Sequence, residues 1–288
     1  MSVALITGTS TGIGLATALH FARAGHDVYA GVRNLATATE LTKAIEREPL
    51  GVTPVVIDVD DGASVQRGVG EVLAKAGRVD VLVNNAGIGG GGPLEDVPVD
   101  WAHTLFETNY FGAIRMIQAV LPGMRVRRSG AIVNVTSIAG RVAIAGHGHY
   151  SAVKHALEAA SEALAQEVLA FGIRVAIVEP GVVVTPIFSK ARRFADPASP
   201  YVEHVRRLLA YYQKQLPSAA QPADVAAVIH EAVTTRAPRL RWLVGEDAKR
   251  LAEGRRRLSD EEYVAAARPA SIDEYLETMR RHFGFDWR

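Results

Sequence analysis

Short runs of β-branched and aliphatic residues alternate along this chain with longer amphipathic stretches, and this alternation constrains the fold more than any other feature. Apolar runs of this length predict buried strands, and stretches with helical periodicity predict helices that pack against them. The predicted strands are residues 3–7, 28–32, 52–57, 79–83, 130–135, 173–178 and 241–244. The predicted helices are residues 14–24, 35–46, 63–76, 101–124, 150–171 and 222–235.

Strands that are joined by helices of this length form βαβ units, in which the strands run parallel within one sheet. We therefore predict an α/β fold: a Rossmann-type doubly wound parallel sheet of about seven strands, with helices on both faces. Ligands of such sheets bind at the carboxyl ends of the strands. Residues 1–245 would form one catalytic domain with a strand-free substrate lid at 182–220, and residues 246–288 a helical extension in two pieces.

Composition excludes several classes of function. The net charge of +1 gives no long-range field that would gather nucleic acid or a membrane surface. The chain has no cysteine, which excludes disulfides and thiolate metal sites. No apolar stretch reaches the roughly 20 residues that a membrane-spanning helix needs, and no signal-peptide pattern precedes the first strand. We expect a cytoplasmic protein that binds neither nucleic acid nor a membrane.

The turn between the first strand and the first helix carries glycines and hydroxyl groups: Gly8, Thr9, Ser10, Thr11, Gly12, Ile13 and Gly14. Glycine adopts positive φ angles and has no Cβ that would hold a phosphate away from the backbone. Free N–H groups at the start of a helix, together with the helix dipole, attract phosphate. This turn predicts a dinucleotide site, with a purely structural turn as the alternative.

The end of the second strand bears on which nicotinamide nucleotide binds. An acidic residue there would bond the 2′-hydroxyl of NAD, whereas an arginine suits the 2′-phosphate of NADP. The chain has Arg33 at this place and no Asp or Glu between residues 29 and 34. The planar guanidinium group matches phosphate geometry, and Thr11 can add a hydroxyl bond to the same phosphate. We predict NADP(H), with NAD(H) as the alternative. The alternative interpretation of Arg33 itself is a solvent-exposed residue without a ligand.

A second constellation concerns proton transfer. Tyr150 and Lys154 are four residues apart, so they share one face of a predicted helix. A nearby ammonium group lowers the pKa of a phenol, which otherwise ionises near pH 10. Ser137 ends the strand 13 residues before Tyr150, so both hydroxyl groups can meet at the mouth of the crevice.

These motifs together resemble the short-chain dehydrogenase/reductase family, in which TGxxxGIG, NNAG, a serine before YxxxK, and PG with a following threonine occur in this order. The resemblance runs from about residue 3 to residue 244. It implies an enzyme in which Ser137 holds the substrate oxygen, Tyr150 exchanges the proton, Lys154 grips the nicotinamide ribose and Asn109 supports a water. Residues 29–34 and 87–95 also look like the 17β-hydroxysteroid and retinol dehydrogenase branch.

The same resemblance assigns nucleotide contacts along the remaining strand ends. Asp58 would contact the adenine, with a cap for the following loop as its structural alternative, and Val59 would also bind the cofactor. The NNAG segment would lie along the adenine ribose through Asn85, Ala86 and Gly87. The segment beside the nicotinamide would contain Pro180, Gly181, Val183 and Thr185.

The predicted function is reversible hydride transfer between NADP(H) and a secondary alcohol, or its ketone or aldehyde, on a hydrophobic body. An apolar wall for such a molecule is expected from Ile138, Val142, Ile144, Val182, Val183 and Phe188, with Tyr201, Tyr211 and Tyr212 in the lid.

Two other functions remain alternatives: an NADP(H)-binding sensor without turnover, and a sugar-nucleotide epimerase, for which the C-terminal segment is short. His147 and His149 lack a third ligand at a metal-site spacing. We therefore expect no metal but a role at the substrate mouth, with His149 the closer of the two. The alanine-rich helix at 151–170 favours a homodimer or homotetramer, as the family implies.

Overall fold

A computed structural model describes residues 2–48, 50–237 and 239–287. Among these residues, one parallel sheet has seven strands in the order β3-β2-β1-β4-β6-β7-β9. The strands of this sheet are β1 (Val3–Thr7), β2 (Asp27–Val32), β3 (Val52–Val56), β4 (Val81–Asn84), β6 (Gly130–Val135), β7 (Ile173–Pro180) and β9 (Arg241–Val244). The prediction of a doubly wound parallel sheet of about seven strands is confirmed.

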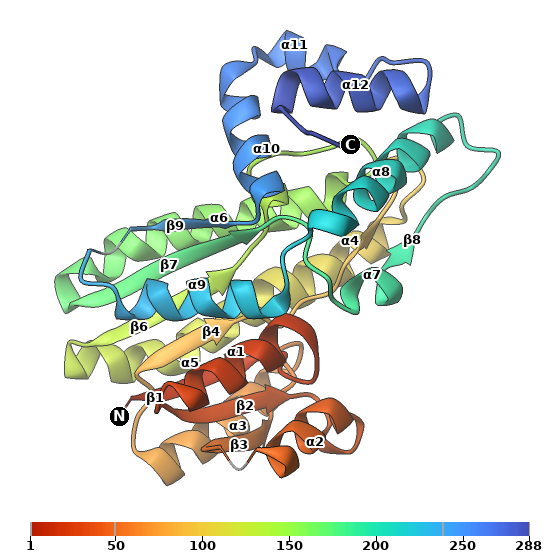
Figure 1. Cartoon of the computed structure of the whole chain (residues 1–288). Helices are drawn as coiled ribbons and strands as arrows, with labels where there is room; N and C mark the ends of the chain where they lie inside the picture. The colour runs from red at the N-terminus through yellow and green to blue at the C-terminus, as the bar shows by residue number, and fades with distance from the viewer. Residues whose placement is uncertain (1, 49, 238, 288) are drawn as a thin grey trace.

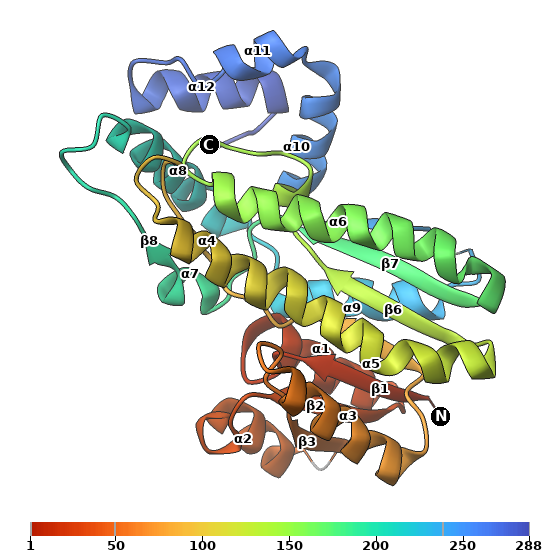
Figure 2. The same ribbon diagram turned by 180° about the vertical axis from the view of Figure 1, so that it is seen from behind.

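Helices cover both faces of the sheet. Figure 1 looks onto the face covered by α1 (Gly12–Arg23), α2 (Thr39–Arg47) and α9 (Pro222–Thr234). Figure 2 looks onto the opposite face, covered by α3 (Gly62–Ala76), α4 (Val99–Phe106), α5 (Gly112–Arg127) and α6 (Gly148–Val168).

Side chains alternate in direction along each strand and so contribute to two separate hydrophobic cores, one on each face of the sheet. In β1, Ala4 and Ile6 pack beneath α1 and α9, whereas Val3 and Leu5 pack beneath α3 and α5. Successive side chains of a strand point to opposite faces, so a strand with helices on both sides is apolar throughout. Burial of both faces stabilises the sheet. The candidate site lies at one edge of this sheet.

The predicted helix at 101–124 is not one continuous α-helix. It consists of α4, a π-helical turn at Glu107–Phe111, and α5. The side-chain amide of Asn109 donates to the Leu105 carbonyl oxygen at 2.9 Å, four residues back. This is the acceptor that a regular α-helical backbone bond would use, and such π-turns occur often at functional sites.

The segment at 182–220 also differs from its prediction. It contains α7 (Ile187–Lys190), a two-residue strand β8 (Arg192–Arg193) and α8 (Val202–Gln215). β8 pairs in parallel with β5 (Gly90–Gly91), so this predicted strand-free segment does carry a short strand. Whether it acts as a lid remains a prediction.

The C-terminal region forms three helices within the described residues rather than two: α10 (Glu246–Arg257), α11 (Asp260–Ala265) and α12 (Ile272–Phe283). The extra break comes from two capping boxes. The hydroxyls of Ser259 and Ser271 accept bonds from the backbone of Glu262 and Glu274, at 3.1 and 3.2 Å. A serine with glutamate three residues later marks a helix start, so each box begins a new helix. These helices pack with α8 beyond the carboxyl end of the sheet (Figures 1 and 2).

Candidate active site

A cavity of about 400 Å³ lies at the carboxyl ends of the parallel strands. Its lining comes from the turn after β1, from the ends of β2, β4, β6 and β7, and from α6, α8 and α10. We call the part around Gly8, Ser10, Thr11, Gly12 and Arg33 the glycine end. The apolar end is the part lined by Phe188, Leu208, Leu209, Tyr212 and Leu251.

Close backbone packing shapes the glycine end. Gly8 has a φ of 70°, and a Cβ on it would lie 2.7 Å from the Cα of Ala86. A Cβ on Gly14 would lie 2.2 Å from the Gly8 carbonyl oxygen. Thr11 precedes α1, and its side chain makes no capping bond within the described structure. The first N–H groups of a helix have no intrahelical partner, so this turn offers donors to an anion.

Most of the residues predicted to bind the nucleotide line this one cavity. They are Gly8, Ser10, Thr11, Gly12, Ile13, Arg33, Val59, Asn85, Ala86, Gly87, Pro180, Gly181, Val183 and Thr185. Thr9, Gly14 and Asp58 lie outside the lining that the described residues form. The Thr9 hydroxyl donates to the Gly31 carbonyl oxygen at 3.1 Å, Gly14 packs beneath Gly8, and an Asp58 carboxylate oxygen accepts from the Asp60 N–H at 3.2 Å. Thr9 and Gly14 therefore shape the turn from behind.

Arg33 follows β2 and reaches the cavity from an exposed position. Within residues 2–48, 50–237 and 239–287, no carboxylate forms an ion pair with it. A guanidinium group without a fixed partner is free to meet an anionic ligand.

Ser137 and Tyr150 both line the cavity, and the Ser137 hydroxyl lies near enough to the phenol to affect its pKa. The Ser137 Oγ accepts from the Ala139 N–H at 3.1 Å and donates to the Pro180 carbonyl oxygen at 3.4 Å, which fixes its rotamer. Burial raises the pKa of Tyr150 to about 12, and the Ser137 bond only partly opposes this. The prediction that Lys154 lowers the pKa of Tyr150 was therefore wrong for this structure: burial of the charged form dominates, and Tyr150 is a protonated phenol at neutral pH.

Lys154 lies on the same helix face as Tyr150, with its Nζ 5.7 Å from the centre of the phenol ring. The ammonium group donates to the Val135 carbonyl oxygen at 3.2 Å, which ties α6 to the end of β6. Burial lowers the pKa of Lys154 to about 8, and the Glu158 carboxylate opposes this shift. Lys154 is therefore mostly charged at neutral pH but near its titration range.

The π-turn brings Asn109 into the cavity lining. Its amide nitrogen donates to the Ile88 carbonyl oxygen at 3.1 Å as well as to Leu105. Its Oδ1 is buried and has no partner among the described residues. A buried acceptor of this kind is costly unless a ligand or water bonds it.

His147, rather than His149, lies against Tyr150, so the expectation that His149 is the closer was wrong. The imidazole stacks on the Tyr150 ring with centroids 4.6 Å apart and planes at 13°. The Tyr212 hydroxyl lies 3.4 Å from its Nδ1. Burial lowers the pKa of His147 to about 4, so the ring is neutral. The short turn before α6 aims His147 inward, and no sequence pattern distinguished the two histidines.

The cavity lining contains most of the residues that we expected in its apolar wall: Ile138, Val142, Ile144, Val182, Val183, Phe188, Tyr211 and Tyr212. Tyr201 does not belong to this set. Its hydroxyl donates to Glu95 at 2.6 Å at an exposed position. No local sequence pattern predicted that α10 contributes Asp247 and Leu251 to the lining. The Asp247 carboxylate accepts from the Val182 N–H at 2.6 Å and so holds α10 against the site.

The family is decided by comparison with known proteins. A model of the short chain dehydrogenase family matches residues 2–196. The chain belongs to the short-chain dehydrogenase family. The prediction drawn from the ordered motifs is therefore confirmed, and this short-chain dehydrogenase is an oxidoreductase that acts on CH–OH groups.

Curated relatives and a solved structure resemble this short-chain dehydrogenase over most of its length. A 3-ketodihydrosphingosine reductase of Bacteroides thetaiotaomicron is 37% identical and aligns over 84% of this chain and 87% of its own. Retinol dehydrogenase 8 of Bos taurus is 37% identical over 82% and 79%, compatible with the retinol dehydrogenase branch. The crystal structure of a short-chain dehydrogenase from Streptomyces avermitilis has a TM-score of 0.79 at 37% identity, covering 97% and 98%. No helix in the described ranges is long and apolar enough to cross a membrane.

Proposed function

We propose that this short-chain dehydrogenase interconverts a secondary alcohol and its ketone, or an aldehyde, with NADP(H) as the preferred cofactor. The observation that carries the proposal is the convergence of Asn109, Ser137, Tyr150 and Lys154 on the cavity that also contains the glycine end. The names of two relatives, a keto reductase and a retinol dehydrogenase, support an alcohol and carbonyl pair.

The residues present fit a nicotinamide dinucleotide. Gly8 and Gly14 leave no room for a Cβ, and α1 presents its start to the glycine end. Arg33, with Ser10 and Thr11 beside it, would hold a 2′-phosphate. Lys154 would bond the nicotinamide ribose. When bound, the nicotinamide supplies or accepts the hydride.

The residues of this chain would handle the substrate oxygen and its proton. The Ser137 hydroxyl, held by Ala139 and Pro180, would bond the carbonyl oxygen. Tyr150, a neutral phenol at pH 7, would donate its proton to that oxygen, which is the role that reduction needs. The Lys154 ammonium stabilises the phenolate left behind, and the unpartnered Asn109 Oδ1 would bond the water that returns a proton.

The apolar end supports a hydrophobic substrate. Aliphatic and aromatic side chains from α8 and α10 close it, and the His147 ring is held neutral beside Tyr150. A cavity of this kind binds an apolar body and orients it through a few polar groups.

Titration with NADPH and NADH, followed by a screen of ketones and alcohols with the tighter nucleotide, tests the proposal. We expect tighter binding of NADPH and turnover of bulky apolar ketones. Turnover restricted to small charged ketoacids would refute the substrate class, and tighter binding of NADH would refute the cofactor preference.

A further inference from the structure

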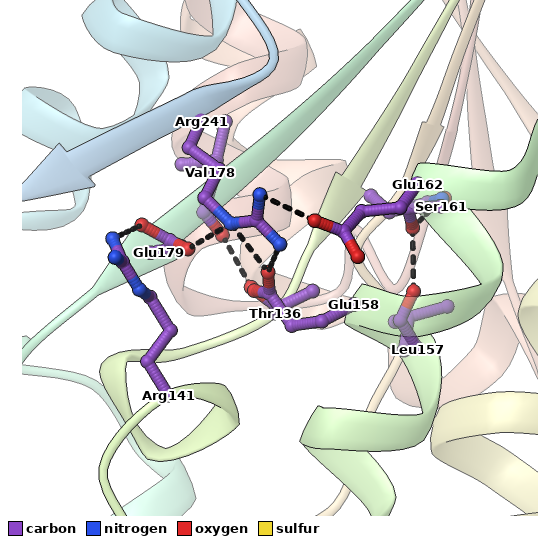
Figure 3. Close-up of polar contacts among 10 residues, drawn as sticks. Thr136, Arg141, Leu157, Glu158, Ser161, Glu162, Val178, Glu179 and Arg241 are labelled. Atoms are coloured by element: carbon purple, nitrogen blue, oxygen red, sulfur yellow. Dashed lines mark hydrogen bonds and ion pairs between the residues drawn. The ribbon is translucent and has the colours of Figure 1, made fainter. Parts of the chain in front are cut away.

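A cluster of charged side chains from α6, β7, β9 and the turn after β6 surrounds two buried carboxylates outside the cavity lining (Figure 3). Glu158 of α6 and Glu179 of β7 are 3% and 0% exposed. Arg241 of β9 reaches between them, 3.1 Å from a Glu158 oxygen and 3.2 Å from a Glu179 oxygen. Arg141 meets the other Glu179 oxygen at 3.4 Å, and Glu162, at the half-exposed edge, lies 2.8 Å from Arg241. The proposed reaction uses none of these groups.

Glu158 links the two segments that carry catalytic residues. The Thr136 hydroxyl donates to its Oε1 at 2.6 Å, and Thr136 immediately precedes Ser137. On α6, Glu158 lies one helical turn after Lys154, on the same face. The backbone at Gly140 presses on the helix between them, because a Cβ there would lie 2.9 Å from the Glu158 Cγ and 3.1 Å from the Lys154 carbonyl oxygen. The carboxylate is thus held in place by the strand end, the turn and the helix.

Charged and polar groups from several elements surround Glu158 and shift its pKa. The charged or polar groups facing it are Lys154 and Glu162 on α6, Thr136 on β6, Glu179 on β7, Arg241 on β9, and Arg141 after the Ile138–Gly140 turn. Burial raises the pKa of both buried carboxyls, to about 7 for Glu179. For Glu158, the hydrogen bond from the Thr136 hydroxyl and the charge of Arg241 oppose this rise. Its carboxylate therefore has a hydrogen-bond donor and a cation as partners, one helical turn from Lys154.

We propose that Glu158 is a positioning residue of the active site: its carboxylate places a negative charge one helical turn from Lys154, and its bond to Thr136 sets the strand end that presents Ser137. Arg241 and Thr136 hold that carboxylate in place. Its charge favours the ammonium form of Lys154. The inference rests on the proposed function only through the role of Lys154, since the ionisation of Lys154 is measurable without turnover.

The first test measures that ionisation directly in protein without nucleotide. Acetic anhydride reacts only with a neutral amine, so mass spectrometry of Lys154 acetylation against pH gives the midpoint of its titration. In Glu158→Gln, which keeps the size and the hydrogen-bonding oxygen, we expect the midpoint to fall by about one pH unit. The matched control, Glu162→Gln, also removes a carboxylate from Arg241 and should leave the midpoint unchanged. A parental midpoint in Glu158→Gln overturns the proposal.

The second test measures reduction of a ketone against pH. Glu158→Gln should move the alkaline limb of the profile to lower pH, with about a tenfold loss of rate above that limb and little loss below it. A uniform loss at every pH would indicate a purely structural role and overturn the proposal.

Thr136→Val covers the case in which Glu158→Gln does not fold. It removes the hydroxyl that stabilises the Glu158 charge and keeps the side-chain volume, so it should shift the acetylation midpoint in the same direction by less. Should Thr136→Val acetylate like the parent, the proposal fails. A protein that acetylates as expected but turns over no carbonyl compound refutes the proposed function and leaves the role of Glu158 intact.

Discussion

The glycine end and the apolar end of the cavity are built in different ways. At the glycine end the backbone packs so closely that a Cβ at Gly14 would lie 2.2 Å from a carbonyl oxygen, so few residue types fit. At the apolar end Leu209 and Leu251 make non-directional contacts that other aliphatic side chains can replace. We therefore expect the first end to hold its ligand by geometry and charge, and the second to select by volume. Four substitutions test this contrast.

Tyr150→Phe, between the two ends, has the largest expected effect. It removes the proton donor and keeps the ring that stacks on His147. Carbonyl reduction should fall by roughly 10²- to 10⁴-fold, the usual contribution of a general acid. NADPH affinity, measured by fluorescence titration, should stay within about twofold, since this change is remote from the glycine end. Retention of more than a tenth of the turnover would show that another group supplies the proton.

Arg33→Ala tests the glycine end alone. Loss of a charged hydrogen bond costs about 2 kcal/mol, so the Kd for NADPH should rise roughly ten- to a hundredfold. The Kd for NADH and the KM for a ketone should not change. Arg47→Ala, an exposed arginine on α2 outside the cavity lining, is the control. An equal loss of affinity for both nucleotides would show that Arg33 does not distinguish them.

His147→Phe tests whether the His147 ring is buried away from water. Because burial lowers the pKa of His147 from 6.5 to about 4, the unfolded chain binds a proton in this range that the folded chain does not. The free energy of unfolding should therefore fall as the pH drops from 6.5 to 4. The variant keeps the stacked ring and should lose about 2 kcal/mol less over this range, as urea denaturation at the two pH values would show. Equal losses in both proteins would contradict the burial of His147.

Leu209→Ala has the smallest expected effect. Leu209 is half-buried on α8 and lines the apolar end, so truncation removes about 1 kcal/mol of contact with an apolar substrate. The KM for a bulky ketone should rise roughly fivefold, with no change in NADPH affinity. Leu216→Ala, at an exposed leucine outside the lining, provides the comparison. A weakened NADPH affinity in Leu209→Ala would break the separation of the two ends.

The sheet and most helices could be predicted because buried parallel strands are continuous apolar runs, as Val81 to Val83 of β4 illustrate. The π-turn at Asn109 could not, since one side-chain bond to Leu105 interrupts an otherwise helical pattern. The start of α12 could have been predicted from Ser271 and Glu274, a signal that the strong charge of the segment obscured.

Some residues of the candidate site could also be predicted from the sequence, and others could not. Residues whose spacing is set by a turn or a helix, such as Gly8 and Tyr150, could be placed at the cavity from sequence. The positions of His147 and Leu251 depend on how separate segments pack, which no local pattern encodes. The buried Glu158 was equally invisible, because a glutamate on an amphipathic helix normally indicates a solvent-facing position.

The Val182 N–H donates to the Asp247 carboxylate, and this bond makes α10 a structural part of the cavity wall. Selection or engineering can therefore alter which molecules this oxidoreductase admits by changing one helix near the end of the chain. The groups that we propose for proton transfer, Tyr150 and Lys154, would keep their positions on α6. A library confined to the inward side of that helix, around Leu251, would explore new specificities at little risk to the chemistry.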